Sequence, residues 1–239
     1  MMNTWKDAFW LASIEWRKSW FGTLCLFFAL FVLAASYSWV LEVETQAPSL
    51  LTDIGFILSF GCVAFMVRPK ELQLQKVEGD VWVSPFFMML NMFPIEKEVL
   101  IKSRFVHMLF PSLPFQVLFL LLFTPRLLES MVVLEYVAFS IIWLAFGVSS
   151  SFVFAASDVG ERITPIKLGI YSVVFYGGVT AVLVWLSLKT DRGVVGWAME
   201  AAKNFAIGSS LISAVVTVGS YYFWKRYMKK KMFQIDYLK

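Results

Sequence analysis

Few side chains in this chain of 239 residues could carry out nucleophilic, acid–base or metal chemistry. His107 is the only histidine, so the sequence cannot supply the paired histidines of an H-E-x-x-H zinc site, and a Ser-His-Asp triad would depend on that one imidazole. No Gly-Lys pair occurs, which excludes the phosphate-binding loop G-x-x-x-x-G-K-[ST]. The sequence therefore predicts a protein that is not an enzyme and that holds no cofactor of its own.

One polar segment interrupts a mostly apolar chain. It reads N-M-F-P-I-E-K-E-V-L-I-K-S-R at residues 91–104, whereas the whole chain is 59% hydrophobic, 18% aromatic and only 16% charged. Soluble proteins contain about 25% charged and about 45–50% apolar residues. The composition therefore indicates a protein that lies in lipid, and the polar segment needs a separate reason.

Six apolar runs are long enough to cross a bilayer, which takes about 20 residues in a helix. Four of them contain no Asp, Glu, Lys, Arg or His, a fifth contains only His107, and the sixth contains only Asp53 near one end. We predict an all-α integral membrane protein with a single domain over residues 1–239. Its six transmembrane helices are expected at residues 21–41, 47–67, 105–125, 136–157, 168–188 and 205–224.

The distribution of positive charge predicts the orientation. Of the 21 Lys and Arg residues, 17 fall on one side of the six spans, and the other side has only Arg126, Lys189, Arg192 and Lys203. Because positively charged flanks stay in the cytoplasm, both termini are expected there, in a multi-pass protein. The basic run K-R-Y-M-K-K-K directly follows the last span, which favours anionic membrane lipid over nucleic acid as its partner.

Residues 1–20 form an amphipathic pattern rather than a span. The residues that recur at helical spacing on one side are Trp5, Phe9, Ala12, Trp16 and Trp20. The charged residues that fall on other sides are Lys6, Asp7, Glu15, Arg17 and Lys18. Because Trp prefers the headgroup region, the pattern predicts an interfacial helix on the cytoplasmic membrane surface. A solvated leader is the alternative.

The loop over residues 68–104 is much longer than a connection between two spans requires. We predict two short helices in it, with Pro69 and Pro94 in their first turns and with Gly79 and Pro85 as interruptions between them. Four charged residues are then expected on a protruding contact surface: Glu78, Asp80, Glu96 and Lys97. A plain solvated loop is the alternative.

The interiors of the spans are uncharged, which disfavours ion-coupled secondary transport because such proteins place ionisable groups at membrane depth. Two stripes of small residues predict close helix packing, although a substrate-facing role stays open. They are Gly147, Ser151 and Ala155, and Ser209, Ser213 and Thr217. Phe56 and Phe60 could face a substrate or could simply face lipid.

Three features together resemble the membrane subunits of ABC transporters of the type-2 exporter class. The N-terminal segment resembles the family's elbow helix and reads W-L-A-S-I-E-W-R-K-S-W. The loop between the second and third spans is similar to the family's loop at that place and reads V-E-G-D-V-W-V-S-P-F-F-M-M-L-N-M-F-P-I-E-K-E-V-L-I-K-S-R. Six spans complete the pattern. The positions that carry the loop motif are Glu78, Gly79, Phe93 in place of Leu, Pro94, Ile95, Lys97 beside the basic position, and Lys102.

The resemblance implies that residues 68–104 contain a coupling helix that docks on a separate ABC ATPase, which would bind the ATP and Mg²⁺. It also implies a second permease copy or paralogue, and a location in the plasma membrane of a bacterium. A second ATPase contact would lie in D-V-G-E-R-I-T-P-I-K at residues 158–167, with Asp158, Glu161 and Arg162 as candidates. The expected contact residues are thus Glu78, Gly79, Asp80, Pro94, Glu96, Lys97, Lys102, Asp158, Glu161 and Arg162.

The expected function is outward transport of a hydrophobic or amphipathic substrate, such as a peptide, a drug or a lipid. The Arg-Asp-x-Lys-x-Arg-Tyr pattern of the family's polysaccharide exporters is absent after the elbow, where the chain reads R-K-S-W-F-G-T-L-C. Two alternatives from other classes remain. One is an ATP-independent secondary carrier or channel, and the other is a membrane immunity or scaffold protein.

Overall fold

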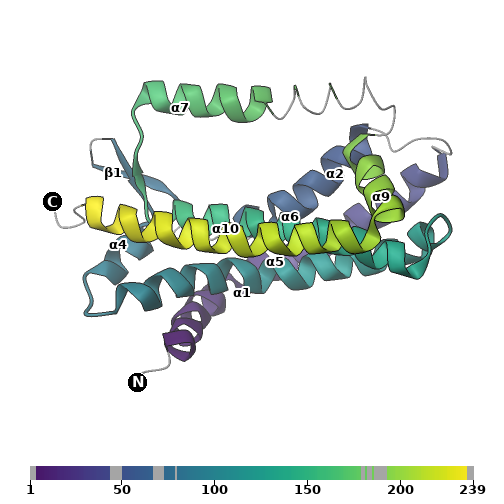
Figure 1. Ribbon diagram of the computed structural model, residues 1–239. Helices are drawn as coiled ribbons and strands as arrows, with labels where there is room; N and C mark the ends of the chain where they lie inside the picture. Colours follow the sequence, from purple (N-terminus) through teal and green to yellow (C-terminus); the bar gives the residue numbers. More distant parts are fainter. Residues whose placement is uncertain are drawn as a thin grey trace.

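Four long helices organise the part of the molecule that the computed structural model describes, namely residues 4–43, 50–66, 73–78, 80–178, 181, 185 and 193–235. Helices α5 (Lys97–Leu128), α6 (Val133–Ser157) and α10 (Ala206–Gln234) lie side by side, and α1 (Thr4–Val43) packs against α5 (Figure 1). α5 and α6 are antiparallel, whereas α10 runs in the same direction as α6 (Figure 1). The three helices therefore form a bundle with two distinct ends.

Three helices of the described residues are long and apolar enough to cross a membrane: Lys97–Pro125 within α5, Val133–Ser157 and Ala206–Gln234. They contain the spans predicted at residues 105–125 and 136–157 and nearly all of the one predicted at 205–224. The prediction of a largely helical protein is confirmed, and so is the presence of helices long and apolar enough to cross a membrane. α10 continues well beyond residue 224, so its basic end extends the same helix.

The other predicted spans have different local structures. Residues 4–43 form one uninterrupted helix of 40 residues, so no break separates the predicted interfacial segment from the span at 21–41. These residues contain no proline that would end a helix. The span at 47–67 includes α2 (Leu50–Gly61) and α3 (Val63–Met66), and the one at 168–188 includes parts of α7 (Pro165–Ser172) and the π-helix η2 (Val173–Gly177). Much of residues 178–192 lies outside the described part.

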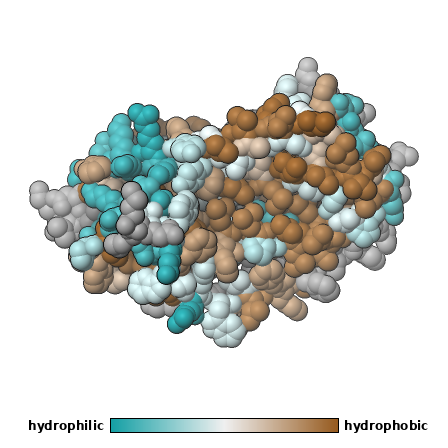
Figure 2. Space-filling model, turned by 60° about the horizontal axis from the view of Figure 1, so that its bottom comes forward, coloured by the Kyte–Doolittle hydropathy of each residue, from teal (hydrophilic) through white to brown (hydrophobic). Residues whose placement is uncertain are grey.

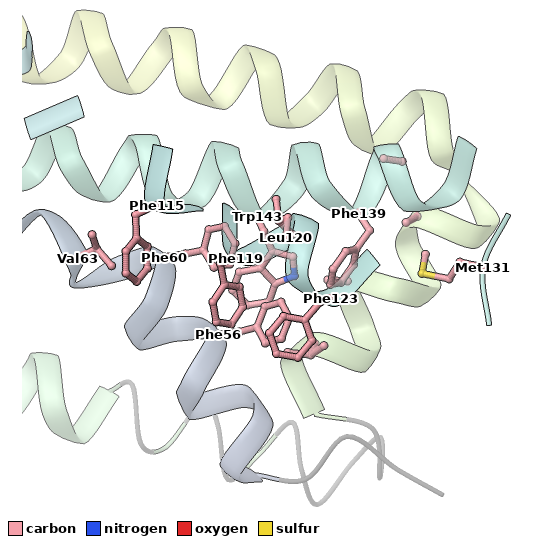
Figure 3. Close-up of a cluster of buried hydrophobic side chains, with 14 residues drawn as sticks. Phe56, Phe60, Val63, Phe115, Phe119, Leu120, Phe123, Met131, Phe139 and Trp143 are labelled. Carbon is pink, nitrogen blue, oxygen red and sulfur yellow. The ribbon is translucent and has the colours of Figure 1, made fainter. Parts of the chain in front are cut away.

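A cluster of aromatic rings fills the space between α2, α5 and α6 (Figure 3). Phe56 of α2 is 2% exposed and has its ring centre 5.0–6.0 Å from those of five neighbours. These neighbours are Phe60, Phe119, Phe123, Phe139 and Trp143. Each favourable aromatic pair adds about 0.5–1.5 kcal/mol beyond the burial of its area. Phe56 and Phe60 therefore pack in the core and do not face lipid.

The stripe of small residues on α6 lies at its contact with α5. Gly147, Ser151 and Ala155 are buried, and the Ser151 hydroxyl lies 3.1 Å from that of Ser112. A Cβ atom on Gly147 would collide with the amide of Gln116, which itself donates to the Phe60 carbonyl at 3.2 Å. The packing interpretation of this stripe is confirmed. On α10 the second stripe, Ser209, Ser213 and Thr217, is half-buried.

A small antiparallel sheet corrects two expectations about the loop at 68–104. Strands β1 (Gln75–Glu78), β2 (Val81–Val83) and β3 (Glu161–Arg162) pair in that order, so the chain is not all-α. Two short helices were predicted, and the described residues of this loop before α5, 73–78 and 80–96, contain one, α4 (Pro85–Asn91). Val and Trp side chains in β1 and β2 favour the pleated strand conformation over helix.

The prolines of this loop also differ from their predicted positions. Pro85 is the first residue of α4 instead of an interruption, and the hydroxyl of Ser84 accepts from the Phe87 N–H at 3.5 Å as the N-cap. Pro94 precedes α5, which begins at Lys97, and therefore does not lie in a first helical turn. Pro69 lies outside the described residues.

The surface divides along the length of the bundle. Hydrophilic side chains gather at the left end of Figure 2, the end at which the sheet, α4 and the C-terminal end of α10 lie in Figure 1, and hydrophobic side chains cover most of the middle. At the opposite end, α9 (Gly193–Asn204) packs against α2 and α6. An apolar middle with polar ends is the surface that a bilayer requires.

Candidate functional site

The two predicted ATPase-contact segments meet in one small sheet. Val81 of β2 is opposite Arg162 of β3, Trp82 is opposite Glu161, and the Ile163 N–H donates to the Asp80 carbonyl at 2.7 Å. We use the name platform for the surface formed by the three strands, α4 and the turn at residues 92–97. Segments about 80 positions apart in the sequence therefore form one continuous surface at the polar end of the bundle.

A glycine permits the close approach of these segments. Gly160, between α6 and β3, has a φ of 87°, and a Cβ atom there would lie 2.7 Å from the Trp82 carbonyl oxygen. Any other residue would be strained at this positive φ, and its Cβ atom would push β2 away. The second contact segment can therefore join the sheet because residue 160 is glycine.

The predicted contact residues divide into an exposed and a buried group. Five are exposed on the platform: Asp80, Pro94, Glu96, Lys97 and Arg162. Glu161 is partly buried, and its carboxylate accepts from Lys231 Nζ at 3.1 Å. Lys102 and Asp158 are 8% and 1% exposed and so do not line the surface. The side chain of Glu78 and all of Gly79 lie outside the described residues.

An apolar patch on the platform was missed by the sequence reasoning. Met89, Met92 and Phe93 are 43%, 56% and 52% exposed at the end of α4, next to the charged Glu96 and Lys97. Met and Phe are enriched at protein interfaces, where an apolar centre is surrounded by a polar rim. The methionine-rich run F-F-M-M-L-N-M-F was the sequence signal that could have identified this patch.

A buried charge cluster lies at the same end of the bundle and consists of Glu15, Arg104, His107 and Asp158. Arg104 is completely buried and binds Glu15 with both terminal nitrogens, Nη1 at 2.9 Å from Oε2 and Nη2 to Oε1. Asp158 Oδ2 lies 3.8 Å from Arg104 Nη1, and His107 Nδ1 lies 3.5 Å from Glu15 Oε2. Such a bidentate pair fixes both the distance and the orientation of the two side chains.

This cluster connects four parts of the fold through one guanidinium. Glu15 belongs to α1, Arg104 to α5, and Asp158 ends α6 just before β3. The guanidinium carbon also lies 5.8 and 6.0 Å from the ring centres of Phe86 and Phe87 in α4. A buried charge is stable only when it is paired and hydrogen-bonded. These elements are therefore held in one fixed arrangement beside the platform.

The position of Glu15 corrects the predicted orientation of the N-terminal helix. Glu15 was placed on a polar face, but it is 1% exposed and shares the buried face of α1 with Ala8, Leu11 and Ala12. The aromatic residues predicted for the interfacial helix lie beside that face. Trp5, Phe9 and Trp20 are 43%, 51% and 61% exposed, while Trp16 stacks on Phe110 with ring centres 3.7 Å apart.

The C-terminal part of α10 forms ion pairs on both sides of the platform. Lys225 Nζ lies 2.5 Å from Glu98 Oε1 in the first turn of α5, and Lys231 bonds to Glu161 in β3. The Lys97 ammonium lies 3.8 Å from the centre of the Phe233 ring. Displacement of the platform would therefore move α10 as well as α5 and α6.

A separate polar contact secures the opposite end of the bundle. Asp53 of α2, 1% exposed, accepts from the N–H groups of Val194 and Val195, both at 2.8 Å. Its carboxylate thereby caps the N-terminus of α9 from another helix, where the helix dipole favours an anion. Gly193 has a φ of 63° and leaves no space for a side chain, because a Cβ atom would collide with that carboxylate.

No group of three or more His, Cys, Asp and Glu side chains within the described ranges is arranged to hold a metal ion. No family model, curated protein or solved structure matches the chain. The function must therefore be argued from the platform, the buried charge cluster and the arrangement of the helices.

Proposed function

We propose that this chain is the membrane subunit of an ABC exporter of the type-2 class, which moves a hydrophobic or amphipathic substrate outward. The platform carries this proposal, because it unites both segments that the resemblance assigns to ATPase contact. It also presents an apolar patch with a charged rim, the composition of a protein-docking surface. A separate ABC ATPase binds the ATP and Mg²⁺, and a second permease copy or paralogue completes the pathway.

The direction of the helices supports six crossings with both termini on the platform side. α6 ends at the platform, yet α10 starts at the opposite end and runs in the same direction (Figure 1). Residues 158–205 therefore connect the two ends of the bundle, which fits a span at residues 168–188. Likewise, Lys102 donates to Thr4 Oγ1 at 2.6 Å near the platform, whereas Asp53 contacts α9 at the far end, which fits a crossing by α1.

The buried charge cluster suggests how ATPase movement reaches the spans. Force on β2, β3 or α4 acts on Asp158 and on the rings beside Arg104, and the Arg104–Glu15 pair passes it to α5 and α1. Close-packed interiors transmit displacement because they deform little. The spans then move as connected bodies instead of as independent helices.

The substrate class follows from the spans. Apart from the buried amide of Gln116, their described interiors consist of apolar, aromatic and small hydroxyl side chains, so they suit an apolar or amphipathic compound better than an ion. A peptide, a drug or a lipid fits this description. Transport of such a compound by an ATPase-coupled pair of permeases requires no ionisable group at membrane depth.

Co-purification tests the proposal directly. The tagged chain is co-expressed with the ABC ATPase whose gene lies nearest to its own, and ATP turnover of the complex is measured in lipid. We expect a stable, ATP-hydrolysing complex that is lost in Phe93→Asp and in Glu96→Lys. The matched control is Glu129→Lys, an exposed carboxylate at the other end of α5, which should leave the complex intact.

Two results would overturn the proposal. If the platform variants bind the ATPase as well as the parent chain does, the platform is not its docking surface. If no ATPase binds and the isolated chain carries a solute along an ion gradient, the protein is a carrier. Circular dichroism and gel filtration of each variant ensure that loss of binding does not reflect loss of folding.

A further inference from the structure

The buried core of the described residues is divided into two separate clusters along the bundle. The first is the aromatic cluster between α2, α5 and α6 (Figure 3), which also takes in α9. The second, which we call the platform core, joins α4 and β2 to the platform ends of α1, α5, α6 and α10. Its largest members are Phe87, Phe105, Met108, Phe152 and Met228. Each cluster should move as one body, because close-packed interiors deform little.

The boundary between the two cores falls at one level of α5 and α6. In α5 the platform core ends at Met108 and the aromatic cluster begins at Phe115. In α6 the aromatic cluster ends at Trp143 and the platform core begins at Phe152. We use the name boundary layer for residues 109–114 of α5 and 144–151 of α6. These two helices are therefore the described elements that belong to both cores over a long stretch of chain.

The boundary layer of α5 contains two of the three prolines inside that helix, Pro111 and Pro114. Proline has no N–H, so each of them removes one hydrogen bond of the helix, and its ring crowds the preceding turn. Sharp bends in helices, of more than about 20°, occur mostly at proline or at Gly and Ser pairs. The third span is therefore weakest at the level where the two cores separate.

The boundary layer of α6 is weak for a related reason. It contains G-V-S-S-S at residues 147–151, and Gly and Ser have lower helix propensities than Ala. Ser151 donates to the Gly147 carbonyl at 2.9 Å, and Ser112 of α5 donates to the Met108 carbonyl at 2.7 Å, which are bonds of the kind that often bend a helix. The 3.1 Å contact between the Ser112 and Ser151 hydroxyls joins the two helices here. A hydrogen bond between helices in a membrane contributes only about 0.6 kcal/mol on average, so this layer should bend more easily than either core.

Two other long helices pass this level without joining the cores rigidly. The buried side chains of α10 are Met228 and Met232, both in the platform core. Its first residue, Ala206, packs on the aromatic cluster directly after Phe205, the non-helical residue that separates α10 from α9. In α1 the buried side chains that the structure describes all fall within residues 8–15. A small movement between the cores therefore requires α10 to pivot at Phe205 and both helices to slide slightly, as packed helices do in shear motions.

We propose that the boundary layer is a hinge at which the platform core tilts against the aromatic cluster. A bend of about 20° at Pro111 would displace Lys97, about 21 Å away along α5, by about 7 Å. The buried charge cluster of Arg104 and Glu15 lies on the platform side of the hinge, so it moves with the platform. The hinge adds to the proposed function the level at which movement of the platform reaches the spans. It is a property of the chain itself and does not depend on an ATPase partner.

Distances between spin labels test the hinge. The full chain, without ATPase or nucleotide, is placed in nanodiscs with its two cysteines replaced, and pairs of introduced cysteines are labelled for double electron–electron resonance. The labelled positions are all exposed and are Met92 and Lys229 at the platform and Val133 and Trp197 at the opposite end. Pairs of Met92 with Val133 and with Trp197 connect the two bodies, whereas Met92 with Lys229 and Val133 with Trp197 lie within one body each. We expect the connecting pairs to spread over up to about 7 Å, the displacement worked out above, and the other two pairs to stay narrow.

Proline substitutions locate the hinge within the chain. Pro111→Ala/Pro114→Ala restores both missing N–H groups and should narrow the distances of the connecting pairs to the width seen within one body. Pro125→Ala makes the same change in the same helix, at an exposed position beyond the aromatic cluster, and is the matched control. It should leave all four distance distributions unchanged. Circular dichroism of each variant shows that a narrower distribution does not reflect a change of fold.

Two contrary results would overturn the hinge. If the connecting pairs are as narrow as the pairs within one body, the bundle is rigid. If Pro111→Ala/Pro114→Ala leaves the connecting pairs broad, or if Pro125→Ala narrows them equally, the movement does not arise at the boundary layer. Because the distances are recorded without an ATPase, failure of the hinge can be told apart from failure of ATPase docking.

Discussion

Replacing Arg104 by methionine is expected to destabilise the protein more than any single change on its surface. Breaking a buried ion pair costs about 3–5 kcal/mol, because the remaining charge is left without a partner in a region that excludes water. Arg104→Met leaves two buried carboxylates, Glu15 and Asp158, so its cost should lie near the upper end of that range. Glu15→Gln leaves Arg104 with Asp158 at 3.8 Å and should lie near the lower end.

The double variant Glu15→Gln/Arg104→Met measures the interaction energy between these two side chains. The double variant eliminates the Glu15 charge that Arg104→Met leaves behind, although Asp158 still loses Arg104, so the combined cost should be smaller than the sum of the two single costs. Contacting residues usually couple by about 0.5–3 kcal/mol. The free energies of unfolding are measured in mixed detergent micelles by tryptophan fluorescence and circular dichroism.

The partly exposed pair between Lys231 and Glu161 is the control for this cycle. Its side chains are 22% and 25% exposed, so Glu161→Gln should change the free energy of unfolding by only about 0.2–1 kcal/mol. The reasoning is refuted if Arg104→Met costs no more than Glu161→Gln, or if the effects of Arg104→Met and Glu15→Gln are simply additive. Either result would mean that the cluster does not hold the helices together.

Two further substitutions test contacts elsewhere in the bundle. Asp53→Ala removes two hydrogen bonds to α9 and should lower the free energy of unfolding by about 1–3 kcal/mol in the same assay, because buried donors lose their acceptor; no change would mean that water replaces the carboxylate. Gly147→Val forces a side chain against Gln116 and should cost about 1–3 kcal/mol through overpacking, whereas Gly169→Ala has no atom within 4 Å and should have little effect. Equal stability of these two glycine variants would contradict the close packing of α5 on α6.

Apolar length and small-residue spacing predicted much of the bundle. The runs at 105–125, 136–157 and 205–224 depend on composition within one helix, which the sequence reports directly. The stripe at Gly147 and Ser151 was also predictable, because its period matches the turn of one helix. These features require no knowledge of which other helix is the partner.

Contacts between distant segments could not be predicted in the same way. Glu15 and Arg104 are 89 positions apart, and a helical pattern indicates which face a residue occupies without showing what covers that face. The sheet was missed for a related reason. Its strands have two to four residues, too short for alternation to be visible, and β3 becomes a strand only because β2 lies beside it.

The contact between Asp53 and α9 also has a consequence for how the protein is made. Asp53 is synthesised 141 residues before the first of the two N–H groups that it binds. During that interval α2 has its acid but not the helix terminus that neutralises it, so this end of the molecule can close only after nearly the whole chain has left the ribosome. A late step of folding therefore depends on one carboxylate that is synthesised early and on a helix terminus that is synthesised much later.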